Sequence, residues 1–337
     1  QNDPTDSGHR LLLRALYGLP VSPRLWQRTL HRDLVEKLGW VPSLHEPGVY
    51  RKLNKDTGKL ECLLSVYVDD CLCTAITPER AEEEVEAVNK LHPLSRIECT
   101  QDANGYQKFD LLGADVFFSK EKRTFRISME AYVLKMLDKF DKKNCKPLTT
   151  PSFPEERQYK ESKVDSEFNY RGCVGGLQWL VVCCRPGIAH ITNVLARASS
   201  KEVTKSMATC CRVALRYLSG TADAGIGYSP QEEEEFTRTY QKMEEHAENT
   251  GVVEGKQVEA PVQTFSDASF GVVYRTMRSV SGIVIFLYGC PIAWKSKVQS
   301  VFSSSTTASE WIALSDAIEM ERSVHEIIQL IMGKPQT

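Results

Sequence analysis

Hydrophobic and polar positions in the first hundred residues predict two helices and a pair of strands. An amphipathic helix is predicted after the loop GLPVSP, because apolar residues recur there at spacings of three and four: Leu25, Trp26, Leu30, Leu34, Val35 and Leu38. Apolar runs at 47–53 and 60–75, separated by the turn sequence NKDTGK, predict strands. Residues 78–92 combine an early proline with a Glu-rich face, which predicts a solvated helix.

The rest of the pattern predicts helices in the middle of the chain and strands toward its end. The segments FDLLGADVFFS (109–119) and TFRISM (124–129) are expected to form a hairpin around KEKR, followed by a helix over 130–140. At least two helices are expected within 168–218. Strand patterns begin at residue 262, and a long helix is expected from about Ser309 to Ile331. The fold class is therefore predicted to be α+β.

Composition fits a globular protein of two or three domains. The chain has 337 residues and no run of 18 apolar residues, so no membrane span is expected. The start QNDPTDSGHR lacks a secretory signal and an initiator methionine, which indicates a fragment or a processed piece. The eleven cysteines show no C-x-x-C spacing and sit mostly in apolar runs. They are therefore interpreted as buried thiols of an intracellular protein.

The net charge of −2 conceals an uneven distribution of charge. Residues 231–259 hold nine glutamates and three basic residues, and the remainder has 39 basic and 35 acidic residues. The remainder is thus mildly basic, which permits phosphate contacts without requiring them. The acidic stretch is poor in apolar residues, and 229–260 is predicted to be a linker or a flexible insertion.

The stretch CLLSVYVDDCLCTA (62–75) contains adjacent aspartates, Asp69 and Asp70, within an apolar run. It predicts a tight β-hairpin whose turn lets both carboxylates approach one site. Two carboxylates held together repel each other unless a cation lies between them, and magnesium prefers such oxygen ligands. A pair of such ions can activate a 3′ hydroxyl and stabilise a leaving pyrophosphate. The alternative is a plain Asp-Asp turn, which rarely interrupts a single apolar run.

With its neighbours, this hairpin resembles the reverse transcriptases of copia-type LTR retrotransposons. LLSVYVDDCLCTA is similar to their Tyr-x-Asp-Asp motif, and the segment from LLRALYGLPVSPRLW to LVEKLGW is similar to their ALYGLKQAPRAW segment. HEPGVYRK, DLLGADVFF, NCKPLTTP, YRGCVGGLQWLVVCC and ALRYLSGTADAGIGY follow the family's order. FSDASF and the segment from RSVSGIVIF to ASEWIALSDA resemble its ribonuclease H domain. The resemblance covers nearly the whole chain except about 1–10 and 230–260.

The resemblance implies a domain organisation. Residues 1–115 would be a reverse transcriptase palm, a ferredoxin-like sheet with helices, without the fingers and the first catalytic strand. Residues 116–228 would be a helical thumb and connection, 229–260 an acidic linker, and 261–337 the N-terminal part of a ribonuclease H-like α/β domain.

The resemblance also implies roles for polymerase residues. Asp69 and Asp70 would bind metal, and Tyr67 would lie under the terminal nucleotide of the primer. Gly18 and its loop would face the incoming nucleotide. Pro20 stands where the family has lysine, which removes a cation and a backbone donor.

Further nucleic-acid contacts are implied for Arg24, Gly113 and Lys295. Gly113 belongs to a strand that supports the primer end in the family. Packing at the start of a helix is an equal alternative for Arg24 and Trp26, and a solvated loop is an equal alternative for Lys295.

For ribonuclease H, Asp267 at a strand end and Glu310 early in the last helix match the first two of four carboxylates that surround two metals. The implied cofactor is Mg²⁺ or Mn²⁺. The implied partners are an RNA template, a DNA primer, an RNA/DNA hybrid and the remainder of the Pol polyprotein, with no membrane. The implied location is intracellular, in cytoplasmic virus-like particles or the nucleus.

Both predicted sites are incomplete in this sequence. The polymerase needs a third carboxylate on an upstream strand; Asp3 and Asp6 lack apolar flanks, and Asp33 falls in a helix. The third and fourth ribonuclease carboxylates of the family lie beyond the long helix. Neither activity is therefore expected from this chain alone. The alternative is a non-catalytic, decayed or co-opted remnant that binds nucleic acid or a partner, and a lone ribonuclease H module is disfavoured by the missing carboxylates.

Overall fold

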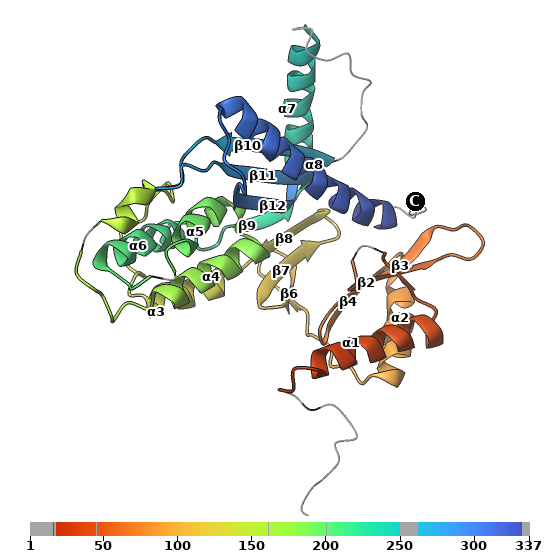
Figure 1. Cartoon of the computed structure of the whole chain (residues 1–337). Helices are drawn as coiled ribbons and strands as arrows, with labels where there is room; N and C mark the ends of the chain where they lie inside the picture. Colours follow the sequence, from red (N-terminus) through yellow and green to blue (C-terminus); the bar gives the residue numbers. More distant parts are fainter. Residues whose placement is uncertain are drawn as a thin grey trace, which may run out of the picture. The chain divides into compact units, whose positions relative to one another are not determined.

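The computed structural model describes residues 16, 18–44, 46–160, 162–199, 201–249 and 262–331, excluding the side chains of residues 240 and 243–249. The chain forms two compact units, one of residues up to 96 together with those from 323 onward, the other of residues 97–322. The described residues form three antiparallel sheets and eight α-helices (Figure 1). The predicted mixture of helices and strands is confirmed. Within these residues, no helix is both long enough and apolar enough to cross a membrane.

The first unit contains a four-stranded sheet, two helices and, from residue 323, the end of the last helix, α8 (Thr306–Ile331). Its strands lie in the order β1-β2-β3-β4, so the sheet follows the chain as a meander. The elements are α1 (Ser22–Arg32), the π-turn η1 (Asp33–Lys37), β1 (Val41–Pro42), β2 (Val49–Leu53), β3 (Leu60–Tyr67), β4 (Asp70–Ala75) and α2 (Pro78–Leu91).

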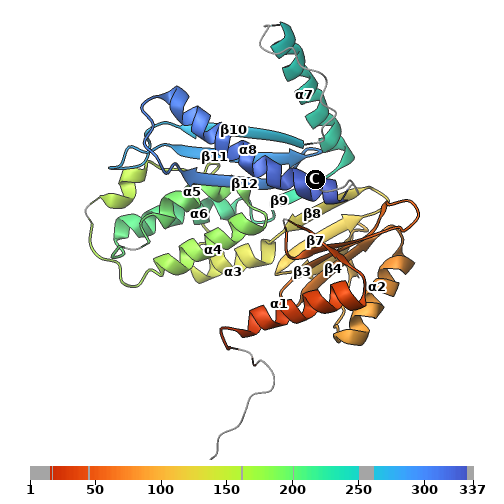
Figure 2. The same ribbon diagram turned by 45° about the vertical axis from the view of Figure 1, so that its right-hand side comes forward.

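Alternation along β3 and β4 divides this sheet into a packed face and an open face. Cys62 and Leu64 of β3 are buried together with Leu30 and Leu34 of the first helix and Val88 of α2. Figure 2 shows α1 and α2 beneath the sheet that ends in the β3–β4 hairpin. The opposite face carries alternate residues such as the exposed Tyr67 and Asp70, so the hairpin presents its polar tip to solvent.

The second unit combines a five-stranded sheet, a helical core and a three-stranded sheet. The strand orders are β5-β6-β7-β8-β9 and β10-β11-β12. Its strands are β5 (Thr100–Gln101), β6 (Gln107–Leu111), β7 (Ala114–Ser119), β8 (Thr124–Ser128), β9 (Gly225–Tyr228), β10 (Val262–Ser269), β11 (Val280–Leu287) and β12 (Cys290–Val298). Its helices are α3 (Glu130–Lys139), η2 (Glu155–Tyr159), α4 (Tyr170–Cys183), η3 (Pro186–Ile188), α5 (Ala189–Ala196), α6 (Lys205–Ser219), α7 (Pro230–Asn249) and the beginning of α8 (Thr306–Ile331).

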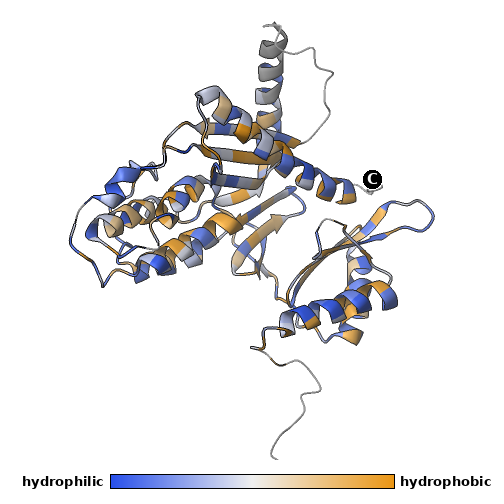
Figure 3. Ribbon diagram, viewed as in Figure 1, coloured by the Kyte–Doolittle hydropathy of each residue, from blue (hydrophilic) through white to orange (hydrophobic). Residues whose placement is uncertain are grey.

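The helical core and the three-stranded sheet are joined by side-chain hydrogen bonds. Trp294 Nε1 of β12 donates to the carbonyl of Val181 at 2.8 Å, and Asn193 Nδ2 donates to the carbonyl of Ser296 at 3.1 Å. Apolar side chains fill the centre of this core. In Figure 3, much of the ribbon of α4 and of the strands has the colour of hydrophobic residues. The two parts of the unit therefore pack as one body.

Two expectations from the sequence need correction. The segment 109–119 is not one strand but a hairpin of β6 and β7, because Leu112 and Gly113 adopt φ angles of 55° and 78° and reverse the chain. Gly113 N also donates to Asp110 Oδ1 at 3.1 Å, which fixes the turn.

The acidic stretch is helical through Asn249 rather than a flexible insertion. Glutamate favours helix in a run of this length, and Glu234 pairs with Arg238 one turn later at 2.8 Å. Phe236 packs on Phe265 and Phe286 of the three-stranded sheet. The remainder of the expected linker, 250–260, lies outside the described residues.

The eleven cysteines are all free. The expected burial holds for six of them, whereas four are partly buried and Cys99 is exposed.

Candidate active site

The β3–β4 hairpin presents the two aspartates at its tip. Tyr67 pairs with Asp70, and Val68 and Asp69 form the two-residue turn between them. Tyr67 and Asp70 share the open face because directly paired residues point to the same side. Both carboxylates are exposed, and so is the Tyr67 ring. The predicted hairpin with two carboxylates at its tip is thus present. The two charged side chains are exposed to solvent and are not buried among the apolar residues that flank them in the sequence.

The turn adopts an unusual backbone conformation. Val68 has a φ of 58°, a left-handed value that is uncommon for any residue with a side chain and rarer for a β-branched one. Two-residue hairpin turns with a positive φ at their first position normally place glycine there. The backbone at Val68 is therefore strained, directly before the two aspartates.

A tryptophan from α1 fixes this strained residue. Trp26 Nε1 donates to the carbonyl oxygen of Val68 at 2.7 Å. The Trp26 ring meets the ring of His92 edge to face, with centroids 5.3 Å apart, and His92 Nε2 lies 3.1 Å from Asp33 Oδ2. A chain of contacts thus runs from Asp33 through His92 and Trp26 to the turn. The sequence left packing at the start of a helix as an equal alternative for Trp26, and nothing in it connects residues separated by 42 and 59 positions.

Asp33 forms ion pairs with two basic residues that are close to it in the chain. Lys37 Nζ lies 3.0 Å from its Oδ1 and Arg32 Nε lies 3.3 Å away. The hydrogen bond from Lys37 is the largest cause that lowers the pKa of Asp33. Asp33 is also buried, so it serves as an anchor for His92 rather than as an additional ligand at the hairpin tip.

The thiols beside the aspartates remain protonated at neutral pH. Burial, followed by the charges of Asp70 and Asp69, raises the pKa of Cys71. Burial is also the main cause that raises the pKa of Cys73 to about 11. Cys71 and Cys73 also lie on the packed face of the sheet, so the donors that the tip presents to solvent are the carboxylate oxygens of Asp69 and Asp70. Such a donor set suits a hard cation such as Mg²⁺, which commonly binds one or two carboxylates and completes its shell with water and phosphate oxygens.

The other residues to which the resemblance assigns a polymerase role lie in two different units of the structure. Gly18 (φ 90°) and Pro20 lie in the exposed loop before α1, and Arg24 is exposed on α1 itself. These residues belong to the first unit, as the hairpin does, whereas Gly113 lies in the β6–β7 turn of the second unit. Their contacts with nucleic acid stay predictions.

Asp267, Glu310 and Lys295 all lie in the second unit and are exposed. Asp267 pairs with Gly282 on β11, so it shares a face of the sheet with Phe265. Ser281 points to the other face, where Gln299 Nε2 joins its hydroxyl to the carbonyl of Ser309, next to Glu310. Asp267 and Ser309, the residue before Glu310, thus lie on opposite faces of this sheet, and the sharing of a metal by Asp267 and Glu310 stays a prediction.

No group of three or more His, Cys, Asp or Glu residues in the described part of the chain could hold a metal ion. The two carboxylates of the hairpin tip thus form a two-ligand arrangement. Asp3 and Asp6 lie outside the described residues.

Comparisons with known proteins find similarity over most of the chain. The family described as "Reverse transcriptase (RNA-dependent DNA polymerase)" matches residues 2–154. The chain is 28% identical over 302 residues to the Retrovirus-related Pol polyprotein from transposon RE1 of Arabidopsis thaliana, covering 89% of this chain and 18% of the relative. It is 25% identical over 314 residues to the corresponding polyprotein from transposon TNT 1-94 of Nicotiana tabacum, covering 90% and 21%.

A shorter relative matches over most of both chains. The putative transposon Ty5-1 protein of Saccharomyces cerevisiae is 24% identical over 310 residues, which are 91% of this chain and 88% of that protein. No solved structure matches the chain significantly.

These matches identify the class of protein domain in this chain and the family of polyproteins to which the chain is related. The chain contains a reverse transcriptase domain. It belongs to the Pol polyproteins of copia-type retrotransposons. It spans about a fifth of the length of the two plant Pol polyproteins that it matches.

Proposed function

We propose that this chain is the central part of an RNA-directed DNA polymerase with ribonuclease H, in which Asp69 and Asp70 hold the polymerase metal. The proposed segments are a palm at 1–115, a thumb and connection at 116–228, an acidic connector at 229–260 and a ribonuclease H-like part at 261–337. The proposed partners are an RNA template, a DNA primer, their hybrid and other parts of the polyprotein.

The observation that carries the proposal is the pair of exposed carboxylates at the tip of a hairpin whose strands are anchored in a core. A bound Mg²⁺ would supply positive charge for a 3′ hydroxyl and for phosphate oxygens. Asp69 and Asp70 supply the oxygen ligands, and the exposed Tyr67 ring offers an apolar surface beside them for a terminal nucleotide. Trp26 restrains the backbone of the turn, which keeps the two aspartates next to each other at the tip.

We also propose that residues 1–337 by themselves do not extend a primer. Two carboxylates hold a pair of metal ions weakly, and a missing ligand in such a site typically reduces the rate by orders of magnitude. The proposed ribonuclease H site also has too few carboxylates to hold two metal ions firmly, because only Asp267 and Glu310 are assigned to it.

A primer-extension assay tests both the catalytic role of Asp69 and the proposed inactivity of the chain by itself. The template is poly(rA) with an oligo(dT) primer, in Mg²⁺ or Mn²⁺, and the chain is compared with Asp69→Asn and with Asp56→Asn, an exposed aspartate in the β2–β3 turn. The expected result is background incorporation for all three. Incorporation that is lost in Asp69→Asn and kept in Asp56→Asn would show that the chain alone is active and that Asp69 is catalytic.

The catalytic assignment has its own readout. Binding of Mn²⁺, measured by electron paramagnetic resonance, is expected to weaken at least tenfold in Asp69→Asn/Asp70→Asn and to stay unchanged in Asp56→Asn. Equal Mn²⁺ affinity in all variants would favour the second candidate function, a non-catalytic remnant that binds nucleic acid or a partner. The exposure of both carboxylates with few further ligands is the observation that keeps this candidate open.

A further inference from the structure

The two aspartates of the hairpin tip are held in different ways. Asp70 is the first residue of β4 and pairs with Tyr67 across the hairpin, so the sheet holds its backbone. Asp69 lies in the two-residue turn, outside this pairing, and directly follows the strained Val68. The orientation of Asp69 therefore depends on the conformation of the turn itself.

A hydrogen bond from a side chain orients the peptide between Val68 and Asp69. Within the described part of the chain, Trp26 Nε1 is the one side-chain donor to this turn, and it bonds the carbonyl oxygen of Val68 at 2.7 Å. The peptide is trans and planar, so its plane contains this oxygen together with the nitrogen and the Cα atom of Asp69. A donor that fixes the oxygen thus also fixes the direction in which the chain enters Asp69.

The Trp26 ring is not held by burial alone. It stands on α1 and is 36% exposed. The ring of His92 meets it edge to face, with centroids 5.3 Å apart and an angle of 86° between the ring planes. Aromatic rings favour this arrangement, so His92 limits the rotation of the indole and keeps its N–H directed at the turn.

His92 is itself fixed at two points. It ends α2 as the C-cap residue, where its backbone N–H donates to the carbonyl oxygen of Val88 at 2.8 Å. Its Nε2 lies 3.1 Å from Oδ2 of the buried Asp33, and only 14% of the His92 side chain is exposed. Three segments, α1, η1 and the end of α2, therefore converge on one turn of the hairpin.

We propose that Trp26 and His92 are positioning residues of the metal site, which hold Asp69 in its binding orientation through the peptide that follows Val68. This role rests on the proposed function, because it requires Asp69 and Asp70 to hold the metal ion. Trp26 acts on the backbone of Asp69, and His92 acts on Trp26, so neither side chain is a ligand. Such support matters most in a site with two protein ligands, where the orientation of each contributes strongly to affinity.

The first test measures the Mn²⁺ affinity of the whole chain by electron paramagnetic resonance. Trp26→Phe keeps an aromatic ring against His92 but removes the N–H donor, and it is expected to weaken Mn²⁺ binding about three- to tenfold. His92→Ala is expected to weaken binding as well. In a chain that already carries Trp26→Phe, His92→Ala should cause no further loss, because His92 acts through Trp26.

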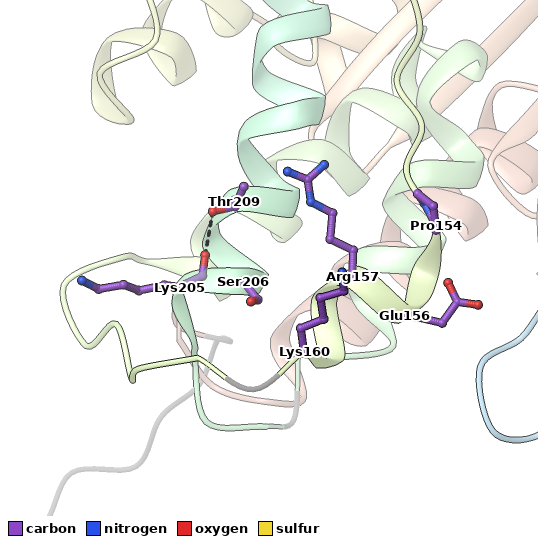
Figure 4. A pocket seen from close by; sticks show the side chains of 7 residues that line it. All are labelled: Pro154, Glu156, Arg157, Lys160, Lys205, Ser206 and Thr209. Atoms are coloured by element: carbon purple, nitrogen blue, oxygen red, sulfur yellow. Dashed lines mark hydrogen bonds between the residues drawn. The ribbon is translucent and has the colours of Figure 1, made fainter.

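Two controls remove comparable groups away from the hairpin. Trp179→Phe changes a tryptophan of α4 that has the same exposed fraction of 36%. Thr209→Val removes one side-chain hydrogen bond, which Thr209 Oγ1 donates to the carbonyl oxygen of Lys205 at 2.8 Å beside a pocket between η2 and α6 (Figure 4). Both residues belong to the second unit, and both variants are expected to leave the Mn²⁺ affinity unchanged.

A route through Asp69 predicts an asymmetry between the two aspartates. In a chain with Asp69→Asn, Trp26→Phe is expected to leave the residual Mn²⁺ affinity unchanged, whereas in a chain with Asp70→Asn it should still lower the affinity. A general loosening of the first unit would lower the affinity in both backgrounds. Equal effects in the two backgrounds, or no effect of Trp26→Phe in the unchanged chain, would overturn the proposal.

A second measurement needs no metal ion. In EDTA, the order parameter of the Asp69 amide from NMR relaxation is expected to fall from about 0.85 to below about 0.6 in Trp26→Phe, while that of Asp70 stays at about 0.85. An unchanged value for Asp69 would contradict the positioning role, whether or not Mn²⁺ binds at the hairpin. The proposed function is tested separately by the Mn²⁺ affinity of Asp69→Asn/Asp70→Asn, so either one can fail without the other.

Discussion

At the scale of single residues, Val68 decides the geometry of the candidate site. The two aspartates follow it directly in the chain, while its own side chain faces solvent and is 56% exposed. A valine with a φ of 58° is strained by about 1 to 3 kcal/mol, which the surrounding hairpin and the bond from Trp26 must offset. The sequence identified the aspartates, but the conformation of the residue between Tyr67 and Asp69 depends on closing a two-residue turn.

Val68→Gly is expected to stabilise the first unit by about 1 kcal/mol, because glycine adopts a positive φ without a steric cost. The measurement is the urea midpoint of unfolding. The control is Val66→Gly, two residues earlier within β3, which is expected to lower the midpoint because glycine weakens a strand interior. A lower midpoint for Val68→Gly as well would show that Val68 is not strained in solution.

At the scale of elements, contacts between buried polar side chains join the helices of the first unit to each other and to its sheet. Asp33, at the junction of α1 and η1, approaches His92 at the end of α2, and Glu84 of α2 accepts Lys52 Nζ from β2 at 2.6 Å. These pairs join segments that are 32 to 59 residues apart. Periodicity in the sequence placed α1 and α2 correctly, but it could not predict which charged residues would meet.

The lowered pKa of Asp33 predicts a pH dependence of stability. A carboxyl whose folded pKa is depressed contributes stability above its unfolded pKa of about 3.9, and this contribution is lost as pH falls through the folded value. Asp33→Asn is therefore expected to lower the urea midpoint at pH 7, and the difference from the unchanged chain should shrink below about pH 4.

The control for this prediction is Asp56→Asn, an exposed aspartate in the β2–β3 turn, which is expected to change the midpoint little at either pH. A difference for Asp33→Asn that is equally large at pH 7 and at about pH 2 would contradict the role of the Asp33 charge.

At the scale of the whole molecule, the second unit depends on a buried carboxylate that joins its two parts. Glu155 of η2 forms an ion pair with Arg197 after α5 at 2.7 Å, and the backbone N–H of Tyr274, between β10 and β11, donates to the same carboxylate at 3.2 Å. One side chain thus links the helical core with the three-stranded sheet. The predicted domain boundary near residue 261 lies within the second unit. The segments before and after it in the sequence belong to the same compact unit.

Glu155→Gln is expected to destabilise the second unit by about 3 kcal/mol, because Arg197 loses the partner for its largely buried charge. Its neighbour Glu156 is exposed, so Glu156→Gln is a matched control that should change stability by less than about 0.5 kcal/mol. Hydrogen exchange in β11 and in α4 should rise together in Glu155→Gln. A change confined to one of them would contradict the link between the two parts.

The sequence by itself determined the α+β class, the hairpin with two aspartates, the helix that begins at Pro78 and the relationship to copia-type Pol polyproteins. These features depend on local patterns: alternation, helix periodicity, capping and ordered motifs. Tertiary structure decided the helical state of the acidic stretch through Phe236, the bond from Trp26 to Val68, and the contacts of Glu155 with Arg197 and Tyr274. Such features arise only when distant residues pack together, because the interaction energy depends on a spatial neighbour that no local pattern specifies.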